Sequence, residues 1–118
     1  MATQTFTVPG RFPSLNEFYR MPPMKQNRVK QECDEAVAWA AKGARIKRME
    51  RVRIRCAWFE PNRRRDLDNV CFGKKFVCDG LVKAGVLIDD KPRYVVGFVD
   101  EFAYDEENPR IVVTLETA

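Results

Sequence analysis

The sequence predicts a small α/β (α+β) domain, in which two main helices pack on a mixed sheet of about four strands in the order β-α-β-α-β-β. Four stretches alternate apolar and polar residues, as half-buried strands do, and two stretches repeat apolar residues at helical spacing. Turn-forming residues separate these stretches. The length of 118 residues suffices for one hydrophobic core but not for two. We therefore expect residues 1–118 to form a single domain.

The chain is expected to begin with a strand and a long loop. Thr3–Val8 alternates polar and apolar residues, and the Pro9-Gly10 pair that follows would end the strand. Four prolines, several aromatic residues and little periodicity then predict a loop over residues 9–26. Loops of this length in compact domains are usually functional or mobile.

Residues 27–47 are predicted to form the first main helix, with Asn27 as a possible N-terminal cap. Small apolar residues recur along it at helical spacing and would pack closely on a sheet. They are Val29, Cys33, Ala36, Val37, Ala40 and Ala44.

A second strand is expected at residues 51–59, where arginines alternate with apolar residues. One face is apolar and would join the core, and the other carries Arg51, Arg53 and Arg55. By itself, this arginine stripe is more typical of a solvated strand face than of a DNA-binding surface. It gains weight as a DNA-binding surface because the chain continues directly into Arg63–Arg65.

The rest of the chain is predicted to contain one helix and two strands. Residues 68–84 would form the second main helix, followed by Gly85, a residue suited to the position after a helix. Residues 94–104 and 110–116 each alternate, and the turn-forming residues between them predict an antiparallel hairpin.

Charge is distributed unevenly along the chain, whose formal net charge is +4. Residues 1–65 hold fifteen Lys or Arg against six Asp or Glu, whereas residues 66–118 hold six against eleven. Such concentrated basic residues are typical of nucleic-acid binding, although surface Lys and Arg can also serve solubility alone. The N-terminal residues show neither a signal-peptide pattern nor a long apolar run, so we expect a cytoplasmic protein without membrane association.

The cysteines and the lack of histidine limit the possible chemistry. Cys33, Cys56, Cys71 and Cys78 lie at irregular spacings without a C-x-x-C pair, which predicts buried thiols and not zinc ligands or disulfide partners. The chain contains no histidine, which excludes Ser-His-Asp, Cys-His and histidine-metal nuclease chemistry. Catalysis must therefore use carboxylates, Lys, Arg, Tyr or a metal ion.

The most informative motif combines basic and acidic residues. Arg63-Arg64-Arg65 is followed by Asp66-Leu67-Asp68-Asn69, and Asp89-Asp90 comes about twenty residues later. Carboxylate oxygens are the hard ligands that Mg²⁺ prefers, and guanidinium groups bind phosphate oxygens in a forked geometry. Together these residues predict a site that holds Mg²⁺ against a phosphodiester.

Simpler interpretations exist for each part of this motif. Asp68 lies where it could cap the second helix, so the acids could serve only the helix N-terminus, and the residues alone leave both interpretations open. Asp89-Asp90 could be a polar turn. Lys75 lies seven residues after Asp68 and returns to nearly the same helical face, whereas Lys74 points away from it.

The chain resembles the RusA family of Holliday junction resolvases, endonucleases encoded largely by phages and prophages. The resemblance rests on R-R-R-D-L-D-N at residues 63–69 and K-x-x-x-D-x-L-V-K-A-G-V-L-I-D-D at residues 75–90. The P-S-x-N-x-x-Y pattern at residues 13–19 is similar as well. The likeness covers nearly the whole chain, and its central segment is the specific part.

The resemblance implies a role for each site residue. The catalytic, metal-binding carboxylates would be Asp66, Asp68 and Asp90. Asp89 would be a close neighbour, and Lys75 would match the family's essential lysine. Arg65 would match the arginine that precedes the family's first aspartate. The basic run and the strand stripe, independently of the resemblance, predict that Arg53, Arg55, Arg63, Arg64 and Arg65 bind DNA.

One departure from the family pattern concerns Lys75. Between Asn69 and Lys75 this chain has three more residues than the type resolvase, around Cys71-Phe72-Gly73. Lys75 therefore lies seven residues after Asp68, where the type resolvase has its lysine four residues after the aspartate. Both spacings return to nearly the same face of a continuous helix, whereas a break at Gly73 would move the lysine.

The resemblance also implies a homodimer that binds a four-way (Holliday) DNA junction and makes paired symmetric nicks with Mg²⁺, without a small-molecule cofactor. A two-fold dimer matches the two-fold symmetry of such a junction. The sequence therefore predicts a Mg²⁺-dependent, structure-selective endodeoxyribonuclease. The competing hypothesis is a branched-DNA-binding protein without catalysis, against which the three retained aspartates argue.

Overall fold

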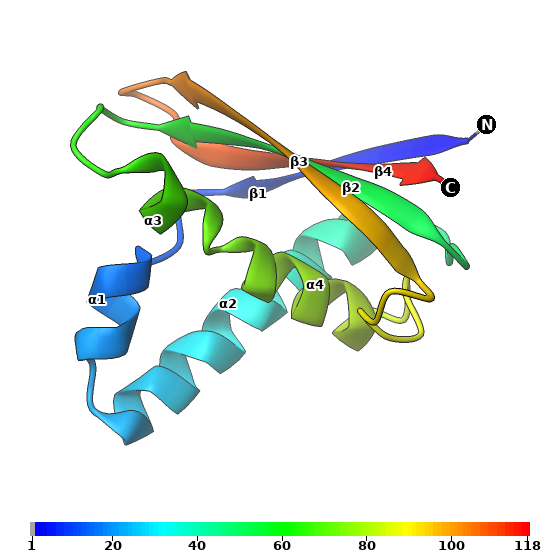
Figure 1. Cartoon of the computed structure of the whole chain (residues 1–118), viewed down its shortest axis with the longest axis horizontal. Helices are drawn as coiled ribbons and strands as arrows, with labels where there is room; N and C mark the ends of the chain where they lie inside the picture. The colour runs from blue at the N-terminus through cyan, green and yellow to red at the C-terminus, as the bar shows by residue number, and fades with distance from the viewer. Residues whose placement is uncertain (1) are drawn as a thin grey trace.

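A computed structural model of the protein describes residues 2–118. Within these residues the elements are β1 (Thr3–Pro9), α1 (Leu15–Arg20), α2 (Pro23–Gly43), β2 (Val52–Glu60), α3 (Leu67–Cys71), α4 (Lys74–Lys83), β3 (Val95–Tyr104) and β4 (Arg110–Thr117). The helices lie on one face of a four-stranded sheet and leave the other face open (Figure 1). This confirms the predicted α+β class and the mixed sheet. None of the helices in residues 2–118 combines the length and the apolar character needed to cross a membrane.

The strands lie in the order β1-β4-β2-β3. β4 is antiparallel to both β1 and β2, whereas β3 pairs with β2 in parallel. In one row across the sheet, Phe6, Val113, Cys56 and Asp100 are register partners. Three of these side chains join the core, and the fourth places a carboxylate at the edge strand.

The predicted hairpin of the last two strands is wrong, because β3 and β4 lie on opposite sides of β2. Their connection crosses the end of β2, where the N–H of Asp105 donates to the carbonyl of Glu60 at 2.8 Å. The Asp105 carboxylate accepts from the N–H groups of Glu107 and Asn108 at 3.2 and 3.1 Å. The turn residues indicate a reversal of direction correctly, but a local pattern does not specify which strand lies between the two.

The hydrophobic core fills the space between the sheet and the helices. Its members alternate along the strands and occupy one face each of α2 and α4. They include Ile54, Trp58, Val113, Leu115, Val37, Ala41, Phe76 and Leu81. Burial of a large apolar side chain stabilises the fold by about 1.5–3 kcal/mol. α4 meets α2 at Gly80, where a Cβ atom would lie 2.8 Å from the carbonyl oxygen of Asp34, so the two helices are in contact through their backbones.

The four cysteines are free thiols, as the spacing predicts. Cys56 and Cys78 are buried, whereas Cys33 and Cys71 are only half-buried. Burial raises the pKa of Cys78 to about 12 and that of Cys33 to about 11. These thiols are therefore uncharged at neutral pH and unsuited to metal binding or nucleophilic attack.

The predicted loop over residues 9–26 contains a short helix, α1. The hydroxyl of Ser14 accepts from the N–H of Glu17 at 3.1 Å, and the Glu17 carboxylate accepts from the N–H of Ser14 at 2.9 Å. The S-x-x-E pattern that makes this capping box is visible in the sequence. The first main helix also begins earlier than predicted, at Pro23, because proline is well suited to the first position of a helix.

The second main helix is interrupted, so the expected single helix over residues 68–84 is wrong. The chain leaves the helical path at Phe72-Gly73, between α3 and α4. Gly73 approaches the core so closely that a Cβ atom would lie 2.8 Å from the Phe12 ring and 3.0 Å from the Trp58 indole. The spacing of a continuous helix therefore does not relate Lys75 to the residues of α3.

Candidate active site

Asp66 and Asp68 lie at the junction between β2 and α3. Asp66 is the N-cap residue, and its carbonyl oxygen accepts from the N–H groups of Asn69 and Val70, each at 3.1 Å. Within residues 2–118 its carboxylate makes no capping hydrogen bond, and Asp68 lies in the first turn. Both side chains are exposed. The interpretation of Asp68 as the cap is therefore wrong, and both carboxylates remain open to a cation.

α1 packs beside α3 and brings the N-terminal motif next to the acidic residues. The N–H of Asn16 donates to Oδ1 of Asn69 at 3.3 Å. The exposed ring of Tyr19 packs against Phe72, with the ring centroids 5.7 Å apart. Two of the three sequence segments that carry the family resemblance, residues 13–19 and 63–69, are thus in direct contact.

Arg65 points into the protein, and its side chain is only 18% exposed. Its Nη1 donates to the carbonyl of Phe12 at 2.9 Å, and its Nη2 donates to the carboxylate of Glu17. Nη1 also lies 3.7 Å from Oε1 of Glu60, which accepts from Arg11 at 2.5 Å. These contacts tie the N-terminal loop, α1 and the end of β2 to the residue that precedes the first aspartate of the motif.

The other predicted DNA-binding arginines occupy two separate regions. Arg63 and Arg64 are exposed in the connection between β2 and α3, and the guanidinium carbon of Arg63 lies 4.2 Å from the centre of the Tyr104 ring. Arg53 and Arg55 lie on β2, and their side chains are on the face of the sheet that the helices leave open.

Arg55 is paired with acidic residues on both neighbouring strands. Its Nη1 donates to Glu101 on β3 at 2.8 Å, and its Nε donates to Glu116 on β4 at 3.1 Å. The side chain is 40% exposed, so each pair contributes little to stability, but together they offset its positive charge. The arginine stripe of β2 is therefore less basic than its alternation indicates.

Asp89 and Asp90 lie in the connection between α4 and β3. The N–H of Asp90 donates to Oδ1 of Asp89 at 2.7 Å, and this bond lowers the pKa of Asp89. Asp90 is exposed at the surface, but the partial desolvation of its carboxyl raises its pKa, and Asp89 and Asp79 act in the same direction. The loop therefore holds two neighbouring carboxylates of different acidity.

The structure does not bring the three predicted metal ligands together within one chain. Asp66 and Asp68 lie at the start of α3, whereas Asp90 follows the far end of α4 (Figure 1). The ten residues of α4 alone span about 15 Å. Among the described residues, no group of three or more acidic or cysteine side chains could hold a metal ion. Exposed carboxylate oxygens suit Mg²⁺, so the metal role of these residues stays a prediction.

The two lysines at the start of α4 differ in their surroundings. Nζ of Lys74 donates to Asp100 at 2.5 Å, and Nε1 of Trp58 donates to the same carboxylate at 2.9 Å. Partial burial opposes the charge of Lys74, but Asp100 outweighs this effect and raises the pKa of the lysine. Lys75 is exposed and forms no ion pair with any residue in 2–118. Of the two, Lys75 is thus the cation available to a substrate.

Sequence reasoning missed two acidic residues that organise the site. Glu60 continues the inward-facing series of β2, and Asp100 occupies the inward-facing row of β3. A carboxylate at a core position of an alternating strand predicts a buried cationic partner, so Glu60 could have been recognised. Asp100 lies on β3, which was predicted to pair with β4 but pairs with β2. Its position beside Trp58 of β2 was therefore not recognised.

Exposed carboxylates at a strand-to-helix junction, together with arginines and an available lysine, are the features of a metal-assisted phosphodiester hydrolase. The chain matches the family model of endodeoxyribonuclease RusA over residues 16–116, and it belongs to this family. The resemblance seen in the sequence is thereby confirmed. The protein is an endodeoxyribonuclease of the Holliday junction resolvase kind. A comparison with curated proteins found no match.

Proposed function

We propose that the protein resolves four-way DNA junctions by paired symmetric nicks, as a homodimer that uses Mg²⁺. Membership of the RusA family supports cleavage of branched DNA. The use of Mg²⁺, the paired symmetric nicks and the homodimer are what the proposal adds to family membership.

The observation that carries the proposal is that the carboxylates at the start of α3 are exposed and do not cap the helix. Asp66 occupies the N-cap position without using its carboxylate as a cap, and the side chain of Asp68, two residues later in the first turn, is exposed. If these acids served only the helix, Asp66 would accept a hydrogen bond from a backbone N–H of the first turn. Unused, neighbouring oxygen ligands support a role in binding a hard cation.

The separation of Asp90 from Asp66 and Asp68 supports the homodimer. One metal ion cannot be held by carboxylates at opposite ends of α4, because ligands lie only about 2 Å from Mg²⁺. In a two-fold dimer, the loop with Asp90 of one copy can lie against the start of α3 of the other copy. Such a dimer would contain two equivalent sites, one for each nicked strand.

Several residues of the chain would act in hydrolysis. When bound, Mg²⁺ would supply an acidified water and offset charge that develops on the phosphate. Asp66, Asp68 and Asp90 would hold the ion, and the exposed ammonium of Lys75 would add positive charge near the non-bridging oxygens. Because the chain contains no histidine, a carboxylate is the side chain best suited to accept a proton.

The test is a nicking assay with a synthetic four-way junction and a duplex of the same sequence, each incubated with the protein and Mg²⁺. We expect symmetric nicks in the junction and none in the duplex. The double variant Asp66→Asn with Asp68→Asn, purified in the same way, controls for contaminating nucleases. Equal cleavage of both substrates, or of neither, would contradict the proposal.

A further inference from the structure

A hollow of about 360 Å³ lies beside the loop that carries Asp89 and Asp90. Its walls are formed by five residues from the segment just before β2 and the connection before β3, which are Glu50, Arg51, Ile88, Arg93 and Tyr94. Backbone hydrogen bonds hold these segments together. The N–H of Met49 donates to Val86 at 2.9 Å, and the N–H of Val52 donates to Tyr94 at 2.8 Å.

The two arginines of this hollow are unpaired cations. Arg51 and Arg93 are exposed, and neither forms an ion pair within residues 2–118. The guanidinium carbon of Arg93 lies 5.8 Å from the centre of the Tyr94 ring, within the range of a cation–π contact. Arg55, in contrast, is held by two glutamates on the open face of the sheet.

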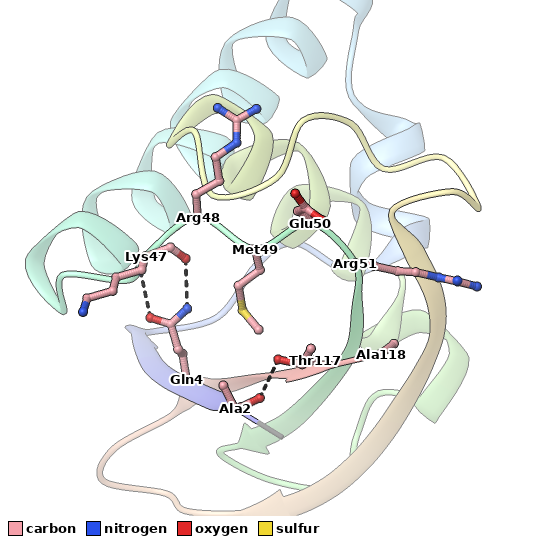
Figure 2. Close-up of a pocket in the computed structure, with 9 residues that line it drawn as sticks. All are labelled: Ala2, Gln4, Lys47, Arg48, Met49, Glu50, Arg51, Thr117 and Ala118. Atoms are coloured by element: carbon pink, nitrogen blue, oxygen red, sulfur yellow. Dashed lines mark hydrogen bonds between the residues drawn. The ribbon is translucent and has the colours of Figure 1, made fainter.

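A second, larger hollow of about 730 Å³ adjoins the first, and Glu50 and Arg51 line both. Lys47 and Arg48 lie on its rim, and Figure 2 shows their charged ends directed outward. The Arg51 side chain extends away from the other residues that line this larger hollow (Figure 2). Four basic residues therefore surround the joined hollows, next to the loop with Asp90.

We propose that Arg51 and Arg93 bind a backbone phosphate of the DNA next to Asp90, so that the hollow is a subsite for the DNA strand. This inference rests on the proposed function. Carboxylates such as Asp90 repel a phosphodiester, so a strand that passes them needs unpaired guanidinium groups nearby. Ile88, which is 49% exposed, and the half-buried Tyr94 provide an apolar wall against which a sugar or a base can pack.

Glu50 is the acidic residue among those that line the hollow. Its replacement tests the proposal in the opposite direction, because it should strengthen and not weaken junction binding. Glu50 lowers the local positive potential without pairing with either arginine. Its replacement by Gln removes one negative charge and keeps the size of the side chain. If a phosphate binds in this hollow, Glu50→Gln should bind the junction more tightly than the unmodified protein.

The decisive experiment measures junction binding in EDTA, where cleavage does not interfere, at salt concentrations from 50 to 200 mM. Each lost phosphate contact should reduce the slope of log affinity against log salt by about one. Arg51→Ala with Arg93→Ala removes the contacts to one phosphate and should thus reduce the slope by about one, so that the loss of affinity over this range becomes about fourfold smaller. Arg51→Lys with Arg93→Lys should keep most of the slope.

A charge-matched control separates a local site from a general effect of net charge. Lys25→Ala with Arg28→Ala removes the same charge from the start of α2, at the other end of the molecule (Figure 1). If both double variants change the slope equally, or if the Arg51 and Arg93 variant binds normally, the subsite is refuted. If the unmodified protein binds no four-way junction, the proposed function fails, which is a different result.

Discussion

Nη1 of Arg65 lies 3.7 Å from Oε1 of Glu60, a carboxylate whose side chain is only 7% exposed. The pair joins the residue before Asp66 to the end of β2, and Arg11 approaches the same carboxylate from the N-terminal loop. Arg65 therefore fixes the position of the acidic motif, and in this conformation it is turned away from solvent.

Removal of the Glu60 charge should destabilise the protein. Glu60→Gln leaves two guanidinium groups close together without a carboxylate, and breaking a buried pair in this way costs about 3–5 kcal/mol. Because Arg11 and Arg65 are partly exposed, we expect a decrease of about 2–3 kcal/mol in the unfolding free energy, measured by urea denaturation. Glu101→Gln is the matched control, since its pair with Arg55 is exposed and should contribute less than about 1 kcal/mol. Equal effects of the two changes would contradict the structural role of Glu60.

Each of the substitutions Asp66→Asn, Asp68→Asn and Asp90→Asn should abolish nicking and preserve junction binding. The loss of one carboxylate weakens Mg²⁺ binding and also removes repulsion of the DNA, so affinity for the junction should be unchanged or higher. The measurements are nicking in Mg²⁺ and gel-shift binding in EDTA. A variant that nicks at the normal rate would remove its residue from the site.

Mixed dimers test whether two copies share each site. If Asp90 of one copy completes the Asp66 and Asp68 site of the other, a dimer of one Asp68→Asn and one Asp90→Asn subunit contains one site with both changes and one intact site. Such a dimer should nick one strand of the junction. If every site is built within one chain, both sites carry a change and the mixed dimer should be inactive. The two subunits can be co-expressed with different tags and purified in sequence.

The neighbouring lysines should have separable effects. Lys75→Ala removes an exposed charge that has no ion-pair partner among residues 2–118, so it should lower the cleavage rate at saturating enzyme with little change in stability. Lys74→Ala removes the partner of Asp100 and should lower the unfolding free energy by about 1–2 kcal/mol, which is a modest loss because the pair is partly exposed. Thermal unfolding and single-turnover nicking distinguish the two. Normal cleavage by Lys75→Ala would show that the break at Gly73 has moved this lysine out of the site.

The helices and strands could largely be predicted from the sequence, because their signals are local. The alternation in β2 places Ile54 and Trp58 on the core face, and the same pattern shows that Arg53 and Arg55 face away from it. Neighbouring residues of a motif also stay together in space, so Asp66 and Asp68 are found at one junction. The short motif sufficed to recognise the family for the same reason.

Relationships between distant segments were decided only by the tertiary structure. The alternation in β3 does not indicate which strand pairs with β3, and in the structure β2 lies between β3 and β4. The position of Asp100 beside Lys74 could therefore not be derived from the sequence. The sequence motif allows the Arg65 side chain to point to solvent or into the protein. Its contacts with Glu60 and with the carbonyl of Phe12 in the N-terminal loop direct it inward. The separation of Asp66 from Asp90 depends on the path of α4, because Asp66 precedes α3 and Asp90 follows α4. Under the proposed dimer, a second copy of the chain completes the site.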